Sequence, residues 1–222
     1  MVNSPPRWEL ALYGSVRVLV VAFCRIWWRL KIVGAEHLPT DGAFVLAPVH
    51  RSNADAFLVS ALTRRRLRYM GKHTLWKRKL PGRFLTAMGG FGVRRGSADR
   101  EALRQCAAVL AGGEPLVIFP EGTRQSGPKI AELQEGAAYL AARAGVPIVP
   151  VGIAGSEQAI RKGSKGLHRA RVTVVAGPAI LPPRHEGRIP RSAIRELSRE
   201  LSRSLQELQT EAQSRDEQRA LG

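Results

Sequence analysis

The run Leu116-Val117-Ile118-Phe119 constrains the fold of this chain more than any other segment, because all four of its residues are apolar. A strand with one face in water alternates apolar and polar residues, whereas a strand buried on both faces is apolar throughout. The run therefore predicts the central strand of a sheet that is covered on both faces.

Segments with strand character alternate with helical segments along the rest of the chain. The expected strands are 31–33, 43–48, 68–79 (a basic strand and loop), 148–153 and 172–175. The expected helices are 55–62, 98–110 and 136–144, the last two followed by glycines. This alternation predicts an α/β fold with a single mixed sheet flanked by helices. A chain of 222 residues suffices for one such domain but not for two.

The N-terminal segment, residues 8–30, is apolar but carries arginines at positions 17, 25 and 29. Its longest charge-free stretches have seven residues, whereas a membrane-spanning helix needs about 20, so neither such a helix nor a signal peptide is expected. Trp27, Trp28 and the arginines instead predict an amphipathic helix in the membrane interface. The alternative is a helix that packs on the protein's own core. Both interpretations hold if one face of the helix packs on the core and another faces the membrane.

The C-terminal tail carries apolar residues at three- and four-residue steps, which predicts one long helix. The stripe consists of Ile194, Leu197, Leu201, Leu205 and Leu208. It is expected to pack on the domain or on a partner. Three parts are therefore predicted: an N-terminal membrane-interfacial segment (1–28), an α/β domain (29–188) and a C-terminal helix (189–222).

Positive charge dominates the chain, with a formal net charge of +17. Residues 56–98 hold eleven Lys and Arg and no Asp or Glu, and they include Arg64-Arg65-Arg66 and Lys77-Arg78-Lys79. Such clusters repel one another, which favours a binding role over a solubilising one. Nucleic acid and an anionic membrane surface both fit a basic patch. However, only three Tyr and six Phe are available for base stacking, and no RNA-binding signature is present.

We therefore expect an anionic membrane surface as partner, with Lys77, Arg78 and Lys79 facing it, and no nucleic acid. A basic nucleic-acid-binding protein without catalysis is the rival class. Metal and disulfide chemistry are not expected, because Cys24 and Cys106 are too few and too far apart. The default is then a reducing compartment. Four further histidines show no ligand spacing, so neither a metal nor a cofactor is predicted: His37, His73, His168 and His185.

The block His50-Arg51-Ser52-Asn53-Ala54-Asp55 follows the expected strand 43–48. Its spacing at a strand end can aim a carboxylate at an imidazole. The carboxylate would bond one ring nitrogen and leave the other free to take a proton from a hydroxyl. His50 is thus predicted as a general base and Asp55 as its orienting partner. On spacing alone, a loop histidine beside a helix that begins near Asp55 is the simpler interpretation.

Three further segments follow this block in order. They are Gly89-Gly90-Phe91-Gly92-Val93-Arg94-Arg95, Phe119-Pro120-Glu121-Gly122-Thr123-Arg124 and Val146 to Ile153. Together the four segments resemble the motifs of the glycerolipid acyltransferases, the family that includes lysophosphatidate and glycerol-3-phosphate acyltransferases. The resemblance covers residues 30–180. Val49 stands where the family usually has Asn, and Gly92 where it usually has a large apolar residue, which affects the acceptor's shape more than the chemistry.

The resemblance implies transfer of a fatty acyl group from acyl-CoA or acyl carrier protein to a hydroxyl of a glycerol-phosphate lipid. The favoured acceptor is 1-acylglycerol-3-phosphate, giving phosphatidate in phospholipid biosynthesis; glycerol-3-phosphate or a glycolipid is the alternative. Because a thioester is already activated, direct attack by the acceptor is expected, and Ser52 is expected to make a turn hydrogen bond rather than act as nucleophile. A bilayer-resident acceptor implies a peripheral or monotopic enzyme at the cytoplasmic face of the membrane.

The resemblance also implies an acceptor site. Arg95 matches the arginine of the second motif, and Arg94 an extra basic residue of glycerol-3-phosphate acyltransferases. The third motif supplies Glu121, Gly122, Thr123 and Arg124. Arginine forks suit phosphate oxygens, and Gly122 allows close backbone approach. Glu121 is expected either to bind a glycerol hydroxyl or to hold Arg124. The fourth motif is expected to be a core strand that shapes the channel.

Overall fold

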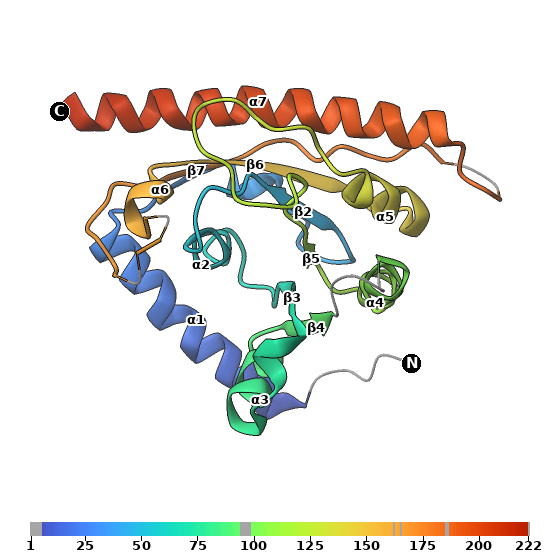
Figure 1. The fold of residues 1–222 in the computed structure, drawn as a ribbon, viewed down its shortest axis with the longest axis horizontal. Helices are drawn as coiled ribbons and strands as arrows, with labels where there is room; N and C mark the ends of the chain where they lie inside the picture. The colour runs from blue at the N-terminus through green and yellow to red at the C-terminus, as the bar shows by residue number, and fades with distance from the viewer. Residues whose placement is uncertain (1–5, 94–98, 162, 165, 185–186, 222) are drawn as a thin grey trace.

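A seven-stranded sheet forms the centre of the protein in the computed structural model, which describes residues 6–93, 99–161, 163–164, 166–184 and 187–221 (Figure 1). The strand order is β1-β7-β6-β2-β5-β3-β4. The strands are β1 (Lys31–Val33), β2 (Val45–Pro48), β3 (Arg68–Lys72), β4 (Gly90–Val93), β5 (Leu116–Val117), β6 (Ile148–Ala154) and β7 (Thr173–Ala176).

The sheet is mixed. Strands β6, β2, β5, β3 and β4 run parallel to one another, whereas β7 pairs antiparallel with β6 and parallel with β1. The predicted single mixed sheet is therefore confirmed. Parallel strands end at the same edge of a sheet, so the His50 block after β2 and residues Glu121 to Arg124 after β5 lie at one edge, where β4 also ends.

Helices cover both faces of the sheet: α4, α5 and α7 lie on one side and α1 and α2 on the other (Figure 1). The α-helices are α1 (Arg7–Trp27), α2 (Asp55–Val59), α3 (Lys79–Ala87), α4 (Asp99–Ala111), α5 (Gly136–Ala144), α6 (Ser156–Ala159) and α7 (Arg191–Leu221). Two short 3-10 helices are η1 (Ala35–His37) and η2 (His73–Trp76). The predicted N-terminal helix and long C-terminal helix are both present.

The apolar run at 116–119 is central, as predicted, but only its first two residues form a strand. β5 pairs with β2 on one side and β3 on the other. The Ile118 N–H still donates to the Leu46 carbonyl at 2.9 Å, after which the chain leaves the sheet. Phe119 is thereby carried to the sheet edge, next to the residues that follow β2.

Helix α7 packs along β6 and β7 through the predicted stripe, and all five stripe residues are buried. The helix approaches closely because of Gly152 in β6: a Cβ atom at this position would lie 2.4 Å from the Leu208 carbonyl oxygen. The buried Gln209 side chain accepts the Ile153 N–H at 3.0 Å. The helix therefore covers the core of the domain itself.

The elements α3 and β4 and the short helices α6 and η1 were not predicted from the sequence. Pro81 and Gly82 lie within α3, and Gly90 and Gly92 within β4, and these residue types weaken helical and strand patterns. β4 exists because it pairs in parallel with β3 along its whole length. Its formation depends on a neighbouring strand, which local sequence does not report.

Candidate active site

His50 lies immediately beyond β2, and Asp55 is the first residue of α2. Asp55 is fully buried, and its Oδ2 atom accepts a hydrogen bond from His50 Nδ1 at 3.0 Å. The same oxygen accepts the backbone N–H groups of Arg51 and Ser52, each at 2.7 Å. Asp55 thus begins the helix and also bonds the imidazole, and the role of His50 as a base stays a prediction.

The bond to Asp55 determines which His50 nitrogen is available for chemistry. When Nδ1 carries the hydrogen that it donates to the carboxylate, Nε2 has a free lone pair. No described group bonds Nε2, and the His50 side chain is 21% exposed. The ring stacks on Phe119, with the centroids 4.1 Å apart. A ring that is oriented and partly open to solvent can accept a proton from a bound hydroxyl.

Ser52 is buried and makes two hydrogen bonds within this region. Its Oγ donates to the Ile160 carbonyl at 3.0 Å and accepts the Ala54 N–H at 3.3 Å. The second bond is the local turn interaction expected for this side chain. These contacts give Ser52 a structural place in the loop.

Glu121 pairs with Arg51, a residue that the sequence did not single out. Its Oε1 accepts from Arg51 Nη1 at 3.1 Å and from the Ala131 N–H at 3.2 Å, and its Oε2 accepts the His50 N–H at 2.8 Å. The two side chains are 1% and 0% exposed. The expectation that Glu121 holds Arg124 is wrong, because the buried carboxylate is occupied by Arg51 and by backbone N–H groups.

This buried ion pair joins two loops that follow different strands. Arg51 Nη2 also donates to the Lys129 carbonyl at 3.1 Å. The Gln125 N–H donates to the His50 carbonyl at 2.8 Å. The loop after β5 is therefore tied to the His50 loop at several points. The sequence signal of this pairing was an arginine inside the His50 block and a glutamate in the third motif, which also follows a strand.

The other third-motif residues lie at the surface beside this pair. Gly122 has φ +70°, a left-handed conformation that favours glycine. Thr123 is exposed and accepts a hydrogen bond from Gln125 Nε2 at 3.0 Å. Arg124 is exposed and lines a small polar cavity of about 200 Å³. The polar cavity is lined by Arg51, Arg124, Gln125, Ser126 and Glu157.

The second-motif residues Arg94 and Arg95 lie outside the described residues. They directly follow β4, which ends at Val93 on the same edge of the sheet as the His50 loop.

An apolar cavity of about 430 Å³ reaches the site from the side of α1 and α3. Its polar exceptions include Tyr69, whose Oη donates to the Ala56 carbonyl at 3.0 Å, and Arg17, whose Nε donates to the Ser60 carbonyl at 2.9 Å. Burial raises the pKa of Tyr69 well above its ordinary value and lowers the pKa of Arg17. The lining residues are Tyr13, Val16, Arg17, Val20, Ala56, Phe57, Ser60, Tyr69, Met70, Gly71, Leu75, Trp76, Phe84, Leu85, Met88, Gly90 and Phe119.

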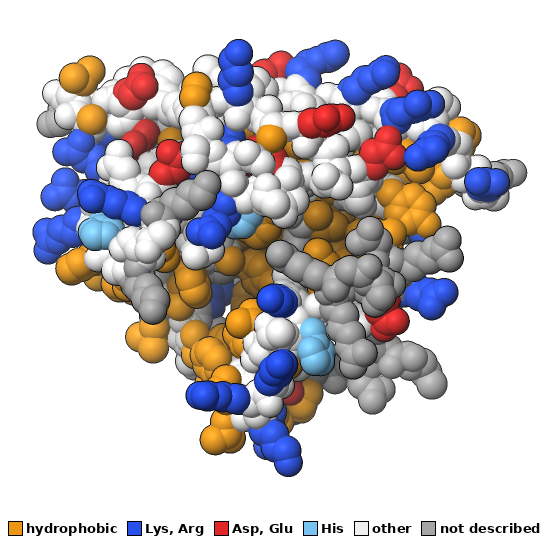
Figure 2. Space-filling view, viewed as in Figure 1, with side chains coloured by type: hydrophobic (Ala, Val, Ile, Leu, Met, Phe, Trp, Pro, Cys, Tyr) orange, Lys and Arg blue, Asp and Glu red, His pale blue; other side chains and the backbone are white. Residues whose placement is uncertain are grey.

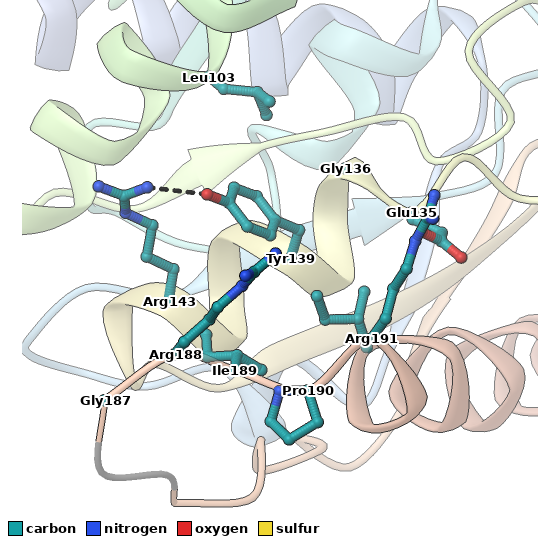
Figure 3. A pocket seen from close by; sticks show the side chains of 11 residues that line it. Leu103, Glu135, Gly136, Tyr139, Arg143, Gly187, Arg188, Ile189, Pro190 and Arg191 are labelled. Atoms are coloured by element: carbon teal, nitrogen blue, oxygen red, sulfur yellow. Dashed lines mark hydrogen bonds between the residues drawn. The ribbon is translucent and has the colours of Figure 1, made fainter.

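A second, larger cavity of about 1030 Å³ lies between α4, α5 and the start of α7 (Figure 3). Arg143 crosses part of it and donates to Tyr139 Oη at 2.8 Å. None of the residues predicted for the site lines this cavity. Phe119, which stacks on the His50 ring, lines the apolar cavity, and Arg124 lines the polar one.

The predicted membrane-facing residues divide into two groups. Lys77, Arg78 and Lys79 are exposed, and Trp27 is 36% exposed with the Arg169 guanidinium 4.9 Å from its ring. Trp28 is 2% exposed, and its Nε1 donates to the His168 carbonyl at 3.1 Å. The prediction that Trp28 faces a membrane is wrong, because this side chain belongs to the core.

The arginine cluster at 64–66 is also not a free cationic surface. Arg65 donates to the carbonyls of Pro39, Gly42 and Gly113. Arg66 is buried and donates to Glu9 at 3.3 Å and to a backbone carbonyl. Its burial lowers its pKa. The expectation that mutual repulsion reserves this cluster for an anionic partner is wrong, because two of the three guanidinium groups bond the protein itself.

Helix α1 packs on the domain through one face and exposes the rest. Tyr13, Val21 and Cys24 are buried, whereas Leu19 and Ile26 are 69% and 79% exposed. By length and composition this helix of 21 residues is long and apolar enough to cross a membrane, so the expectation that no segment reaches that length is wrong. Counting charge-free stretches failed because the apolar residues around each arginine belong to one uninterrupted helix.

Within the described residues, no group of three His, Cys, Asp or Glu side chains could hold a metal ion. Cys24 and Cys106 are both free and buried, and burial raises the pKa of each thiol to about 11. Neither thiol lines the apolar or the polar cavity.

A family model described as Acyltransferase matches residues 29–154. A 1-acyl-sn-glycerol-3-phosphate acyltransferase from Chlamydomonas reinhardtii is 30% identical over 168 residues, which cover 73% of this chain and 50% of that protein. One from Bacillus subtilis (strain 168) is 30% identical over 138 residues, which cover 62% of this chain and 68% of that protein. The chain thus spans about half the length of the algal relative.

A crystal structure of the 1-acyl-sn-glycerophosphate (LPA) acyltransferase PlsC from Thermotoga maritima superimposes with a TM-score of 0.69 at 25% sequence identity. The match covers 91% of this chain and 83% of that chain. It therefore includes far more of the molecule than the four motifs.

Proposed function

The chain belongs to the acyltransferase family, and from this premise we propose that it transfers a fatty acyl group from an acyl thioester to the free hydroxyl of 1-acylglycerol-3-phosphate. The product is phosphatidate, an intermediate of phospholipid synthesis. The observation that carries the proposal is the His50–Asp55 pair, which leaves Nε2 free and whose imidazole stacks on Phe119, a lining residue of the apolar cavity. The relatives' own activity supports the same reaction class.

His50 is the general base in the proposed reaction. Nε2 accepts the proton of the acceptor hydroxyl while the hydroxyl oxygen attacks the thioester carbonyl carbon. The carbon–sulfur bond then breaks, and the proton held by His50 passes to the departing thiolate. Asp55 keeps the hydrogen on Nδ1 and stabilises the imidazolium that forms between these steps. Ester and thiol are the products, with no metal or cofactor in the balance.

Arg124 is proposed to bind the phosphate of the acceptor. It is exposed at the polar cavity, and the neighbouring Gln125 bonds the His50 carbonyl, which fixes this loop relative to the base. Guanidinium groups bond phosphate oxygens through two parallel N–H donors. Glu121 supports this arrangement indirectly, because it neutralises the buried Arg51 and holds the His50 backbone. Arg94 and Arg95, which follow β4 at the same edge of the sheet, are proposed as additional phosphate donors.

The apolar cavity is proposed to hold a fatty acyl chain. Its lining is almost entirely apolar, and Phe119 connects it to the His50 ring. Burial of a hydrocarbon chain in such a cavity is favourable by about 0.8 kcal/mol per methylene. The carbonyl at the end of the chain would then lie near Nε2.

A docking face for the membrane is proposed on α3 and along the exposed side of α1, which meet at the lower corner of Figure 1. We define the docking face as the exposed apolar side chains of these helices, such as Ile26, Leu80 and Phe84, together with Lys77, Arg78 and Lys79. Hydrophobic and Lys or Arg side chains gather over this corner in Figure 2. Apolar insertion and attraction to anionic lipid would act together there. This arrangement suits a peripheral enzyme at the cytoplasmic face of a bilayer.

An acceptor panel tests the proposed function. The purified protein is given radiolabelled palmitoyl-CoA or palmitoyl acyl carrier protein with 1-oleoylglycerol-3-phosphate, glycerol-3-phosphate, lysophosphatidylcholine or 1-oleoylglycerol. We expect the fastest transfer to 1-oleoylglycerol-3-phosphate and far slower transfer to 1-oleoylglycerol, which differs only by the phosphate. Preference for glycerol-3-phosphate would reassign the acceptor. Failure of every pair to react would refute the proposal and make nucleic-acid binding the next assay.

A further inference from the structure

Trp76, the last residue of η2, lies against four glycines from three different elements. These are Gly71 in β3, Gly82 in α3, and Gly90 and Gly92 in β4. A Cβ atom at Gly71 or Gly92 would lie 3.0 Å from the indole ring, and one at Gly90 would lie 3.1 Å from it. Glycine weakens a strand and often marks a place where another group approaches closely. Here the approaching group is the indole of Trp76.

The glycines of β3 and β4 form one continuous surface under the ring. Gly71 and Gly92 are direct partners in the strand register. The indole Nε1 donates to Thr86 Oγ1 at 3.0 Å, and that hydroxyl donates to the Gly82 carbonyl at 3.0 Å. The ring is therefore held by packing on one face and by a hydrogen bond at its edge. A side chain at Gly92, where the family usually has a large apolar residue, would occupy the space that Trp76 fills.

Trp76 also separates two cavities. On one side lies the apolar cavity of about 430 Å³ that reaches Phe119. On the other side lies an outer cavity of about 270 Å³, lined by Trp8, Glu9, Trp76, Lys79, Gly82, Arg83 and Thr86. Of the residues that the structure describes, Trp76 alone lines both. Removing its side chain would join the two spaces.

We propose that Trp76 is the end wall of the acyl-chain site and limits the length of the fatty acyl chain that the enzyme uses. The inference rests on the proposed function, because it assumes that the apolar cavity holds such a chain. A chain that reaches the indole must bend or push the ring off the glycine surface. The fit of a single methylene in a hydrophobic pocket changes kcat/KM by about 10- to 200-fold, so one rigid wall can set a sharp preference.

Chain-length profiles of two matched tryptophan variants test this inference. Trp76→Ala should raise the ratio of kcat/KM for 18-carbon over 12-carbon chains by at least ~10-fold. Trp8→Ala, which changes the outer cavity but leaves the wall in place, should keep the wild-type ratio. Donor length is varied with one acceptor, and acceptor length with one donor. If the chain-length preference shifts only when the donor is varied, the donor's chain lies in the cavity; if it shifts only when the acceptor is varied, the acceptor's chain lies there. Either shift supports the inference.

Two further measurements protect the test against loss of folding. Gly92→Ala should push the indole into the apolar cavity and move the preference toward shorter chains, opposite to Trp76→Ala. Fatty acids with a terminal bromine should quench the fluorescence of Trp76 most strongly at the length that reaches the wall, with Trp76→Phe as the reference. Wild-type transfer combined with unchanged profiles in folded Trp76→Ala and Gly92→Ala would overturn the inference alone. Absence of wild-type transfer would overturn the proposed function, and the inference with it.

Discussion

One oxygen of Asp55, Oδ2, bonds His50 Nδ1 at 3.0 Å and also accepts two backbone N–H groups at 2.7 Å. The other oxygen, Oδ1, is buried and has no hydrogen-bond partner among the described residues. The carboxylate therefore shapes the loop with the same atom that orients the imidazole. His50 and Asp55 should consequently differ when each is replaced, because only Asp55 supports the surrounding backbone.

His50→Ala should lower turnover by at least about 100-fold, the lower range for a lost general base, while the free energy of unfolding changes by less than ~1 kcal/mol. Asp55→Asn should lower turnover as well, because an amide does not hold the imidazole in the required tautomer. In the orientation that places its NH₂ group against Nδ1, this group also faces the backbone N–H groups of Arg51 and Ser52, which lose their acceptor at a cost of about 1 to 3 kcal/mol. Steady-state kinetics and urea unfolding measure both effects. Near-normal turnover of folded His50→Ala protein would eliminate His50 as the base.

The buried Arg51–Glu121 pair should be essential for stability. Glu121→Gln leaves the Arg51 charge buried without its counter-charge, which should cost about 3 to 5 kcal/mol. The exposed pair Arg215–Glu211 on α7, with side chains 40% and 41% exposed, supplies a matched control. Glu211→Gln should cost less than ~1 kcal/mol. Equal costs in urea unfolding would contradict the burial of the inner pair.

Arg124→Ala should weaken the use of a phosphate-bearing acceptor by about 1.5 to 3 kcal/mol, the value of a hydrogen bond to a charged group. The change should appear in kcat/KM for the acceptor and much less in kcat/KM for the acyl donor. Arg203→Ala, at an exposed position on α7, is the control. If donor and acceptor parameters suffer equally, Arg124 contacts the thioester instead of the phosphate.

The docking face should bind vesicles that contain anionic lipid far better than neutral ones, and salt should weaken this binding. Replacing Lys77, Arg78 and Lys79 with Glu should reduce co-sedimentation strongly. The same charge change at exposed positions 195, 199 and 203 on α7 should reduce it much less. Ile26→Glu should also reduce co-sedimentation, although it leaves the basic cluster unchanged. Deletion of the whole helix is a poorer test, because Cys24 lies in the core. Vesicle binding that changes with neither lipid charge nor salt would refute the proposed docking face.

Both cysteines should resist alkylation in the folded protein at pH 8. Burial raises the pKa of each thiol from its ordinary value of 9.0 to about 11, so very little thiolate is present and access is blocked. In the unfolded chain the thiols ionise first as pH rises, so the free energy of unfolding should fall between about pH 9 and 11. Thiol titration with and without guanidinium, and urea unfolding across this range, measure the two effects. Rapid native labelling at pH 8 would show that the thiols are not buried.

Local patterns predicted those features that depend on neighbouring residues in the chain. β1 and α5 lie where the sequence placed them, and the apolar stripe of α7 is buried as expected. The His50–Asp55 contact also followed from short spacing after a strand. Each of these needs only periodicity or a strand end, which a single segment displays.

Features that depend on residues far apart in the chain could not be predicted from the sequence. Trp27 and Trp28 are adjacent and of the same type, yet the turn after α1 buries only the second. Arg51 pairs with Glu121, seventy positions later in the chain, and Arg66 pairs with Glu9 on α1. A cationic run has the same composition whether it faces solvent or bonds internal carbonyls. Only the tertiary arrangement distinguishes the two.

The pairing of β1 with β7 has a consequence for the way the chain acquires its structure. β1 lies at the sheet edge, and its partner strand begins at Thr173. Arg219, near the end of α7, donates to the Arg29 carbonyl, 190 positions earlier. The first of the seven described strands to be synthesised therefore pairs with the last one, and such long-range closure makes folding slow. During that interval the apolar residues that β7 and α7 later cover stay open to solvent, a condition that favours aggregation of the nascent chain.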